Sequence, residues 1–112
     1  MQLNIEDLSD GVTKAALAGR MDIDDAASVD LHFNVLAGSK RALVVDLSDV
    51  SFIASMGLRT LMTCARTISG KGGKMALAAP QENVLKVLTT SGVGEIVAIR
   101  PTLDEAIAFV AD

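Results

Sequence analysis

The sequence predicts a single α/β domain in which a mixed, mostly parallel β-sheet of about five strands packs against about four α-helices. Two observations lead to this prediction. Segments with the period of a strand alternate along the chain with segments that have the period of a helix, and a turn sequence joins the first two segments. The chain has 112 residues, half of them hydrophobic, which is enough for one core. We therefore expect one domain over residues 1–112 with the element order ββαβαβαβα.

The first 18 residues predict a β-hairpin. Met1, Leu3 and Ile5 alternate with polar residues, which is typical of a half-buried strand, and residues 12–18 form a second segment of strand character. Asp10-Gly11 between two such segments is a strong hairpin signal.

The period changes to that of a helix after Gly19. Apolar residues recur at helical spacing from residue 23 to residue 36. An aspartate at position 22, 24 or 25 can cap the start of this helix, and Gly38 can end it. Residues 42–47 then form a continuous apolar segment, as expected for a strand that is covered on both faces.

Residues 57–69 predict a helix with one apolar face, which packs on the sheet. The next segment, residues 69–74, is rich in glycine and lysine. It leads from a helix into a strand, whereas a phosphate-binding loop leads from a strand into a helix. We therefore interpret it as a flexible turn.

The rest of the chain continues the alternation of strands and helices, which favours a sheet with helices packed against it. The expected elements are a short strand over residues 75–78, a helix with Pro80 in its first turn that ends at Ser91-Gly92, a strand over residues 95–99, and a last helix opened by the capping box of Thr102 and Glu105.

Composition argues against several classes of function. The net charge is −4 and three residues are aromatic, so direct binding of nucleic acid is not expected. No apolar segment reaches the roughly 18 residues needed to cross a bilayer, and the acidic start is unlike a signal peptide, so we expect a cytoplasmic protein without membrane insertion. Cys64 and His32 have no neighbours at metal-ligand spacing, and no cofactor motif is present, so neither a metal nor a cofactor is expected.

Residues 44–65 (VVDLSDVSFIASMGLRTLMTCA) resemble the hallmark segment of STAS domains, in which a buried strand ends in an aspartate, a hydrophobic loop follows, and Asp-Ser-Ser/Thr-Gly-Leu opens a helix. Two further segments resemble the family, residues 17–22 (LAGRMD) and residues 87–92 (VLTTSG). The three segments follow one another in the order of the family and extend over most of the chain. The sequence therefore resembles the STAS domains of anti-sigma factor antagonists.

The resemblance implies a regulatory protein rather than an enzyme. In the antagonists, a partner that is both anti-sigma factor and serine kinase phosphorylates the first serine of the motif, which corresponds to Ser55. Gly57 and Leu58 also match the motif, whereas Ala54 replaces its aspartate and Met56 its second Ser or Thr. A phosphate on Ser55 is expected to release the partner. The implied partner-binding residues are Asp22, Ala54, Ser55, Met56, Gly57 and Arg59.

Several of these residues have a structural interpretation as well. Ser55 can cap the helix that follows it, and Asp22 can cap the earlier helix. Arg59, with Arg66 on the same side of the helix, can be a solvated surface charge. Asp46, at the end of its predicted strand, is expected to accept backbone hydrogen bonds from the loop that follows. Neither Asp46 nor Ser55 has a base at a recognisable spacing, so we expect no enzymatic activity.

An alternative function is a STAS subunit that is not phosphorylated, such as an accessory of a lipid ABC transporter or a scaffold in a signalling assembly. Ala54 and Met56 favour this alternative because they make the helix start more apolar, which suits a permanent interface. The sequence leaves self-association open.

Overall fold

The computed structural model describes the backbone of residues 2–21 and 23–111 and the side chains of residues 2–9, 11–21 and 28–111. Met1, which the alternation assigns to the first strand, lies outside this part of the chain. The strands are β1 (Gln2–Asp7), β2 (Thr13–Met21), β3 (Ala42–Ile53), β4 (Lys74–Ala78) and β5 (Ala98–Arg100); the helices are α1 (Ile23–Ser39), α2 (Ser55–Gly70), α3 (Glu82–Thr90) and α4 (Leu103–Ala111); and two 3-10 turns are η1 (Ser9–Gly11) and η2 (Val93–Glu95).

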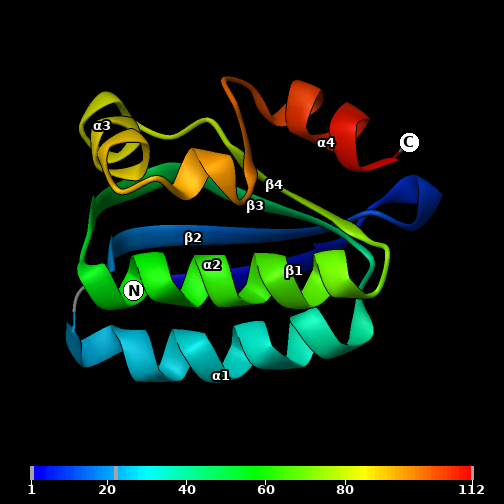
Figure 1. Ribbon diagram of the computed structural model, residues 1–112, viewed down its shortest axis with the longest axis horizontal. Helices are drawn as coiled ribbons and strands as arrows, with labels where there is room; N and C mark the ends of the chain where they lie inside the picture. Colours follow the sequence, from blue (N-terminus) through cyan, green and yellow to red (C-terminus); the bar gives the residue numbers. More distant parts are fainter. Residues whose placement is uncertain (1, 22, 112) are drawn as a thin grey trace.

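The five strands form one mixed sheet in the order β1-β2-β3-β4-β5. β1 pairs antiparallel with β2 through the turn that contains Gly11, whose φ is 76°. The pairs β2–β3, β3–β4 and β4–β5 are parallel, and a helix connects the two strands of each pair. Helices α1 and α2 lie side by side on one face of the sheet, and α4 lies on the other (Figure 1). The predicted fold class and element order are confirmed.

The first half of strand β3, residues 42–47, is buried on both faces, as its apolar sequence predicts. Leu43, Val45 and Leu47 belong to the larger hydrophobic cluster, which also contains residues of α1, α2 and α3. Val44, on the opposite face, belongs to the smaller cluster that includes residues of α4. Because helices cover both of its faces, β3 is the strand around which the core is built.

Strands β2 and β3 are both longer than the sequence predicts. Their pairing continues to Met21↔Ile53, whereas β4 pairs with β3 only as far as Asp46. Two irregularities in the β2–β3 register accompany this extension, and Gly19 lies at one of them with a φ of 108°. A side chain at Gly19 would strain this conformation, so glycine allows the bulge that keeps the strands paired. The segment that the family resemblance assigns to a loop is therefore strand.

Side chains replace the neighbour that β3 loses where β4 ends. The Asp46 carboxylate accepts a hydrogen bond of 3.0 Å from the Ser48 N–H. The predicted backbone acceptor role is confirmed, but both residues lie within β3, so the predicted strand end at Asp46 and the loop after it are wrong. Gln81 Nε2 donates to the Ser48 carbonyl at 2.9 Å, and Asn83 Nδ2 donates to the Ser51 carbonyl at 2.9 Å. These bonds satisfy part of the exposed edge of β3 and hold the start of α3 against it.

Several helix boundaries differ from the prediction, and α2 begins at Ser55, two residues before its predicted start. Gly38 does not end α1, which continues to Ser39, and its φ is not positive as a left-handed helix end requires. Pro80 precedes α3 rather than lying in its first turn. The helix begins at Glu82, and the N-cap residue Gln81 is extended with its side chain on β3.

The last strand is shorter than predicted, because residues 93–95 coil into η2 and leave only residues 98–100 to pair with β4. Gly92 follows α3 with a φ of 79°, which confirms it as the end of that helix. The N–H of Glu105 donates to Thr102 Oγ1 at 3.1 Å, which confirms the capping bond at the start of α4.

Candidate functional site

Ser55, Met56 and Arg59 lie at the carboxyl ends of β2 and β3, where β3 leads into α2. All three residues are exposed, and we call their surface the α2 face. Ala54 and Gly57 lie beside them, the first half-buried and the second buried. The carboxyl ends of strands are where open α/β sheets bind ligands. The structure thus brings together every predicted partner-binding residue except Asp22, which lies outside the described residues.

The first turn of α2 has no side-chain cap. The N-cap residue is Ala54, whose backbone is extended (φ −92°, ψ 171°) and whose carbonyl accepts a hydrogen bond from the Leu58 N–H at 3.1 Å. Ser55 is already helical, so the interpretation of Ser55 as the helix cap is wrong. The N–H groups of Ser55, Met56 and Gly57 have no intrahelical acceptor, and the first turn contains no acidic residue. This helix end therefore favours an anion.

Gly57 is needed for space at the strand-to-helix junction. The Ala54 N–H donates to the Met21 carbonyl at 2.8 Å, which ties the start of α2 to the end of β2. A Cβ on Gly57 would lie 2.8 Å from Met21 Sδ and 3.0 Å from Ile53 Cγ1. Both side chains belong to the buried core, so the glycine allows α2 to start close to the sheet.

A polar groove between α1 and α2 continues the α2 face. Met56, Arg59 and Thr60 line it from α2, and Asp30 and Asn34 line it from α1. The Thr60 hydroxyl lies 3.0 Å from the Asp30 carboxylate and donates across the groove. Met56 is 48% exposed at its edge. Sequence reasoning missed the α1 side of this surface, because the facing of two helices is a tertiary contact.

Arg20 and Phe52 add a stacked pair at the same end of the sheet. They are register partners on β2 and β3, and the Arg20 guanidinium carbon lies 4.3 Å from the centre of the Phe52 ring. Phe52 remains 37% exposed. Arginine and aromatic side chains are enriched among the residues that contribute most to protein interfaces. The sequence placed Phe52 in a hydrophobic segment but gave no signal for its partner.

Other candidates from the sequence lie apart from the α2 face. Burial raises the pKa of the Cys64 thiol to about 12, so it stays protonated at neutral pH. His32 is exposed on α1, with Nδ1 2.8 Å from the Ser28 carbonyl oxygen. Across the described side chains, no three His, Cys, Asp or Glu residues gather as a metal site requires. No helix in the described part of the chain is long and apolar enough to cross a membrane.

Comparison with known proteins agrees with this geometry. The family model described as the STAS domain matches residues 7–106. The chain belongs to the STAS domain family.

Relatives of this STAS domain carry the names of anti-sigma factor antagonists. The anti-sigma-F factor antagonist RsfB of Mycobacterium tuberculosis is 29% identical over 101 residues, which are 89% of this chain and 82% of that protein. A Thermotoga neapolitana protein whose name places it provisionally among the antagonists is 37% identical over 73 residues. That match covers 65% of this chain and 64% of the relative, just under two thirds of its length.

Solved structures show the same fold. The crystal structure of an anti-sigma factor antagonist from Mycobacterium paratuberculosis superposes with a TM-score of 0.90 at 29% identity. The superposition covers 99% of this chain and 94% of that one. The chain therefore shares the fold of this solved antagonist.

Replacing Gly57 with alanine is expected to destabilise the domain, although alanine is the better helix former. The new Cβ forces Met21 and Ile53 to move, which we expect to lower the free energy of unfolding by about 1–3 kcal/mol. Gly38→Ala is the matched control, because a Cβ there meets nothing within 4 Å. We expect it to gain about 0.5–1 kcal/mol. Denaturant unfolding measures both, and equal stability of the two variants would contradict this account.

Replacing Ala54 with aspartate is expected to stabilise the domain by about 1 kcal/mol, because the carboxylate can accept a hydrogen bond from an N–H of the first turn of α2. Asparagine at this position should give a similar gain, whereas valine, which has no acceptor, should give none. Thermal unfolding of the three variants provides the measurement. A gain with valine equal to that with aspartate would show that capping is not the cause.

Proposed function

We propose that this STAS domain is a cytoplasmic anti-sigma factor antagonist that binds its anti-sigma factor through the α2 face. The observation that carries the proposal is the exposed position of Ser55 at the first residue of α2, beside backbone N–H groups that have no side-chain cap. This is the position that the family motif assigns to the phosphorylated serine. The antagonist names of the relatives support the same partner class.

The surface around Ser55 suits a partner with both apolar and acidic groups. Met56 and Phe52 offer exposed apolar area, while Arg59 and Arg20 supply positive charge at the same end of the sheet. Arginine pairs well with carboxylates and keeps its charge at all physiological pH values. The proposed interface therefore has an apolar centre at Met56 with cations around it.

Phosphorylation of Ser55 by the partner is the proposed switch. A phosphate would add about −1.5 to −2 charge at a helix N-terminus, where the free N–H groups stabilise it. Arg59, one turn further along α2, is placed to pair with that phosphate. The phosphate would thus repel acidic groups of the partner and also withdraw Arg59 from them. We therefore expect the phosphate to leave the fold stable and to weaken binding of the anti-sigma factor.

Ser55→Glu is expected to weaken binding of the anti-sigma factor at least tenfold, because a carboxylate must lose its water against the partner. Its free energy of unfolding should stay within about 0.5 kcal/mol of the parent, since a carboxylate in the first turn of a helix is favourable. Ser91→Glu, at an exposed serine beyond α3, is the control and should bind like the parent. Calorimetric titration with the anti-sigma factor encoded in the same genome measures the affinities. Parent-like affinity of Ser55→Glu would place Ser55 outside the interface.

Incubation with that anti-sigma factor and ATP is expected to add one phosphate to the parent and none to Ser55→Ala. Intact-mass spectrometry detects the added phosphate, and peptide mapping locates it. Ser51→Ala, which changes an exposed serine on β3, should still be phosphorylated. If the parent protein gains no phosphate, the phosphorylation switch is wrong. The binding function is tested separately by the titration.

The alternative function, an accessory or scaffold STAS subunit, is favoured by one feature of the structure. Ala54 and Met56 make the start of α2 partly apolar, and Met56 is 48% exposed in the isolated chain. An exposed apolar side chain of this kind suits an interface that a partner covers permanently. Genes for transporter subunits beside the gene for this chain would favour this alternative. A gene for an anti-sigma kinase would favour the antagonist.

A further inference from the structure

In the described part of the sheet, β1, β3 and β5 each have a stretch of unpaired edge, and two of these three stretches are obstructed. β5 is only three residues long and Pro101 follows it directly. The part of β3 beyond β4 is covered by the side-chain amides of Gln81 and Asn83. Short strands, proline and capping side chains are the means by which proteins prevent other chains from pairing with a sheet edge.

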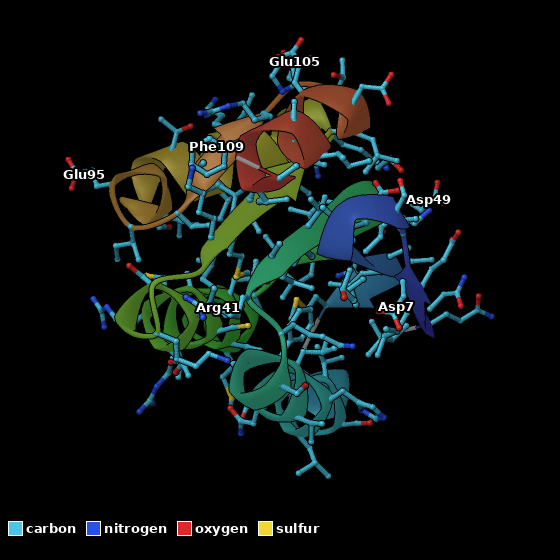
Figure 2. The ribbon with its side chains drawn as sticks, turned by 90° about the vertical axis from the view of Figure 1, so that its right-hand side faces the viewer. Asp7, Arg41, Asp49, Glu95, Glu105 and Phe109 are labelled. Atoms are coloured by element: carbon cyan, nitrogen blue, oxygen red, sulfur yellow. The ribbon has the colours of Figure 1, made fainter. Side chains whose placement is uncertain are left out.

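The third edge, β1, has none of these features. It pairs with β2 in an unbroken register from Gln2↔Ala18 to Asp7↔Thr13 and contains no proline and no lysine. Figure 2 shows this dark-blue strand at the outer side of the molecule, with Asp7 near its end, and among the described residues no strand lies beyond it. Alternate residues of an edge strand direct their N–H and C=O groups outward. β1 is therefore ready to accept another strand.

A groove runs along the inner side of this edge. Leu3 and Ile5 line it from β1, and Ser28, Val29 and His32 line it from α1. Ile5 is 43% exposed, although it points to the core side of the sheet. A strand added to β1 would place its own alternate side chains over this groove and cover Ile5.

We propose that β1 pairs antiparallel with β1 of a second copy of this chain, in the register that sets Asn4 opposite Asn4 of the second copy. Leu3 then lies opposite Ile5 on the apolar side of the sheet, and Gln2 lies opposite Glu6 on the polar side. No like charges meet, and the apolar residues of each copy cover those of the other.

The alternative registers are worse. The one that sets Leu3 opposite Leu3 pairs only residues 2–4 of the described strand. A shift by one residue sets the apolar side of one copy against the polar side of the other. A shift that sets Ile5 opposite Ile5 places Leu3 against Asp7, whose carboxylate already accepts hydrogen bonds from Thr13 and Lys40. The next shift sets Glu6 opposite Glu6. This self-complementarity of β1 is the reason for assigning the edge to a second copy.

The proposed dimer leaves the α2 face of each copy free. β1 runs antiparallel to β2, so its start lies near the end of the sheet that carries Ser55. Antiparallel pairing of two β1 strands then directs the two α2 faces to opposite ends of the dimer. Such a dimer can bind two partners without contact between them.

Sedimentation of the full chain over roughly 10 μM to 1 mM is expected to show a dimer that forms with increasing concentration. The interface consists of one pair of short strands, and an interface with so small a buried area binds weakly. Ile5→Lys, which places a charge on the edge strand, should raise the dimer dissociation constant at least tenfold. Leu31→Lys is the control, because Leu31 is an even more exposed apolar residue at 66% but lies on α1. A parent that stays monomeric at all concentrations, or equal effects of the two variants, would overturn the proposal.

Cross-linking tests the register independently of the affinity. Asn4→Cys should form a disulfide-linked dimer under mild oxidation, since directly opposed residues lie within disulfide distance. Ile5→Cys should cross-link far less, because residue 5 lies opposite residue 3 of the second copy and only diagonally from its residue 5. The native Cys64 is buried and does not compete. Preferential cross-linking of Ile5→Cys would overturn the proposed register. Neither result depends on the anti-sigma factor, so this proposal can fail while the proposed function stands.

Discussion

The pairing of β2 and β3 beyond the end of β4 is the interaction on which the rest of the structure depends. It carries the chain to Ala54, whose N–H bonds the Met21 carbonyl at 2.8 Å and so determines where α2 begins. The same extension packs the Met21 side chain beneath Gly57 and sets Arg20 against Phe52. Without it, the motif residues would still be present but no rigid element would position them.

This extension creates an unpaired edge on β3, and the chain covers it with side chains rather than with a strand. Gln81 and Asn83 belong to the start of α3, so the hydrogen bonds that protect β3 also hold α3 at the carboxyl end of the sheet. β4 ends at Ala78, where the chain turns toward α3, so the side-chain amides take the place of further β4 residues along β3. The carboxyl end of the sheet is therefore built from helix starts rather than from long loops.

Neither α2 nor α3 has a side-chain cap at its start. A cap contributes about 1 kcal/mol to stability, so the domain is less stable by about this amount than it would be with a cap on α2. The uncapped N–H groups remain available to an external anion or to a covalently attached phosphate. At α3, Gln81 is occupied with β3 instead. Local rules for helix starts are thus broken at the end of the domain where function is proposed, as is common at functional sites.

Much of the fold could be predicted because the apolar residues carry the period of their own element. The unbroken apolar segment of β3 and the apolar face of α2 predict buried residues, and the structure confirms both. The prediction failed where an element depends on a distant neighbour. Residues 48–53 mix polar and apolar side chains, and only their pairing with β2 makes them strand. Likewise, nothing local shows that Gly38 stays helical.

The sequence by itself determined the family, the order of the elements and the motif serine, because these are written in local spacing and in short motifs. Only the tertiary structure decided that Ala54 rather than Ser55 is the N-cap of α2, that Gly57 leaves room for Met21, and that β1 is an open edge. Each of these depends on contacts between segments that a whole helix or strand separates in the chain. Such contacts form only when the sheet assembles, so no local pattern records them.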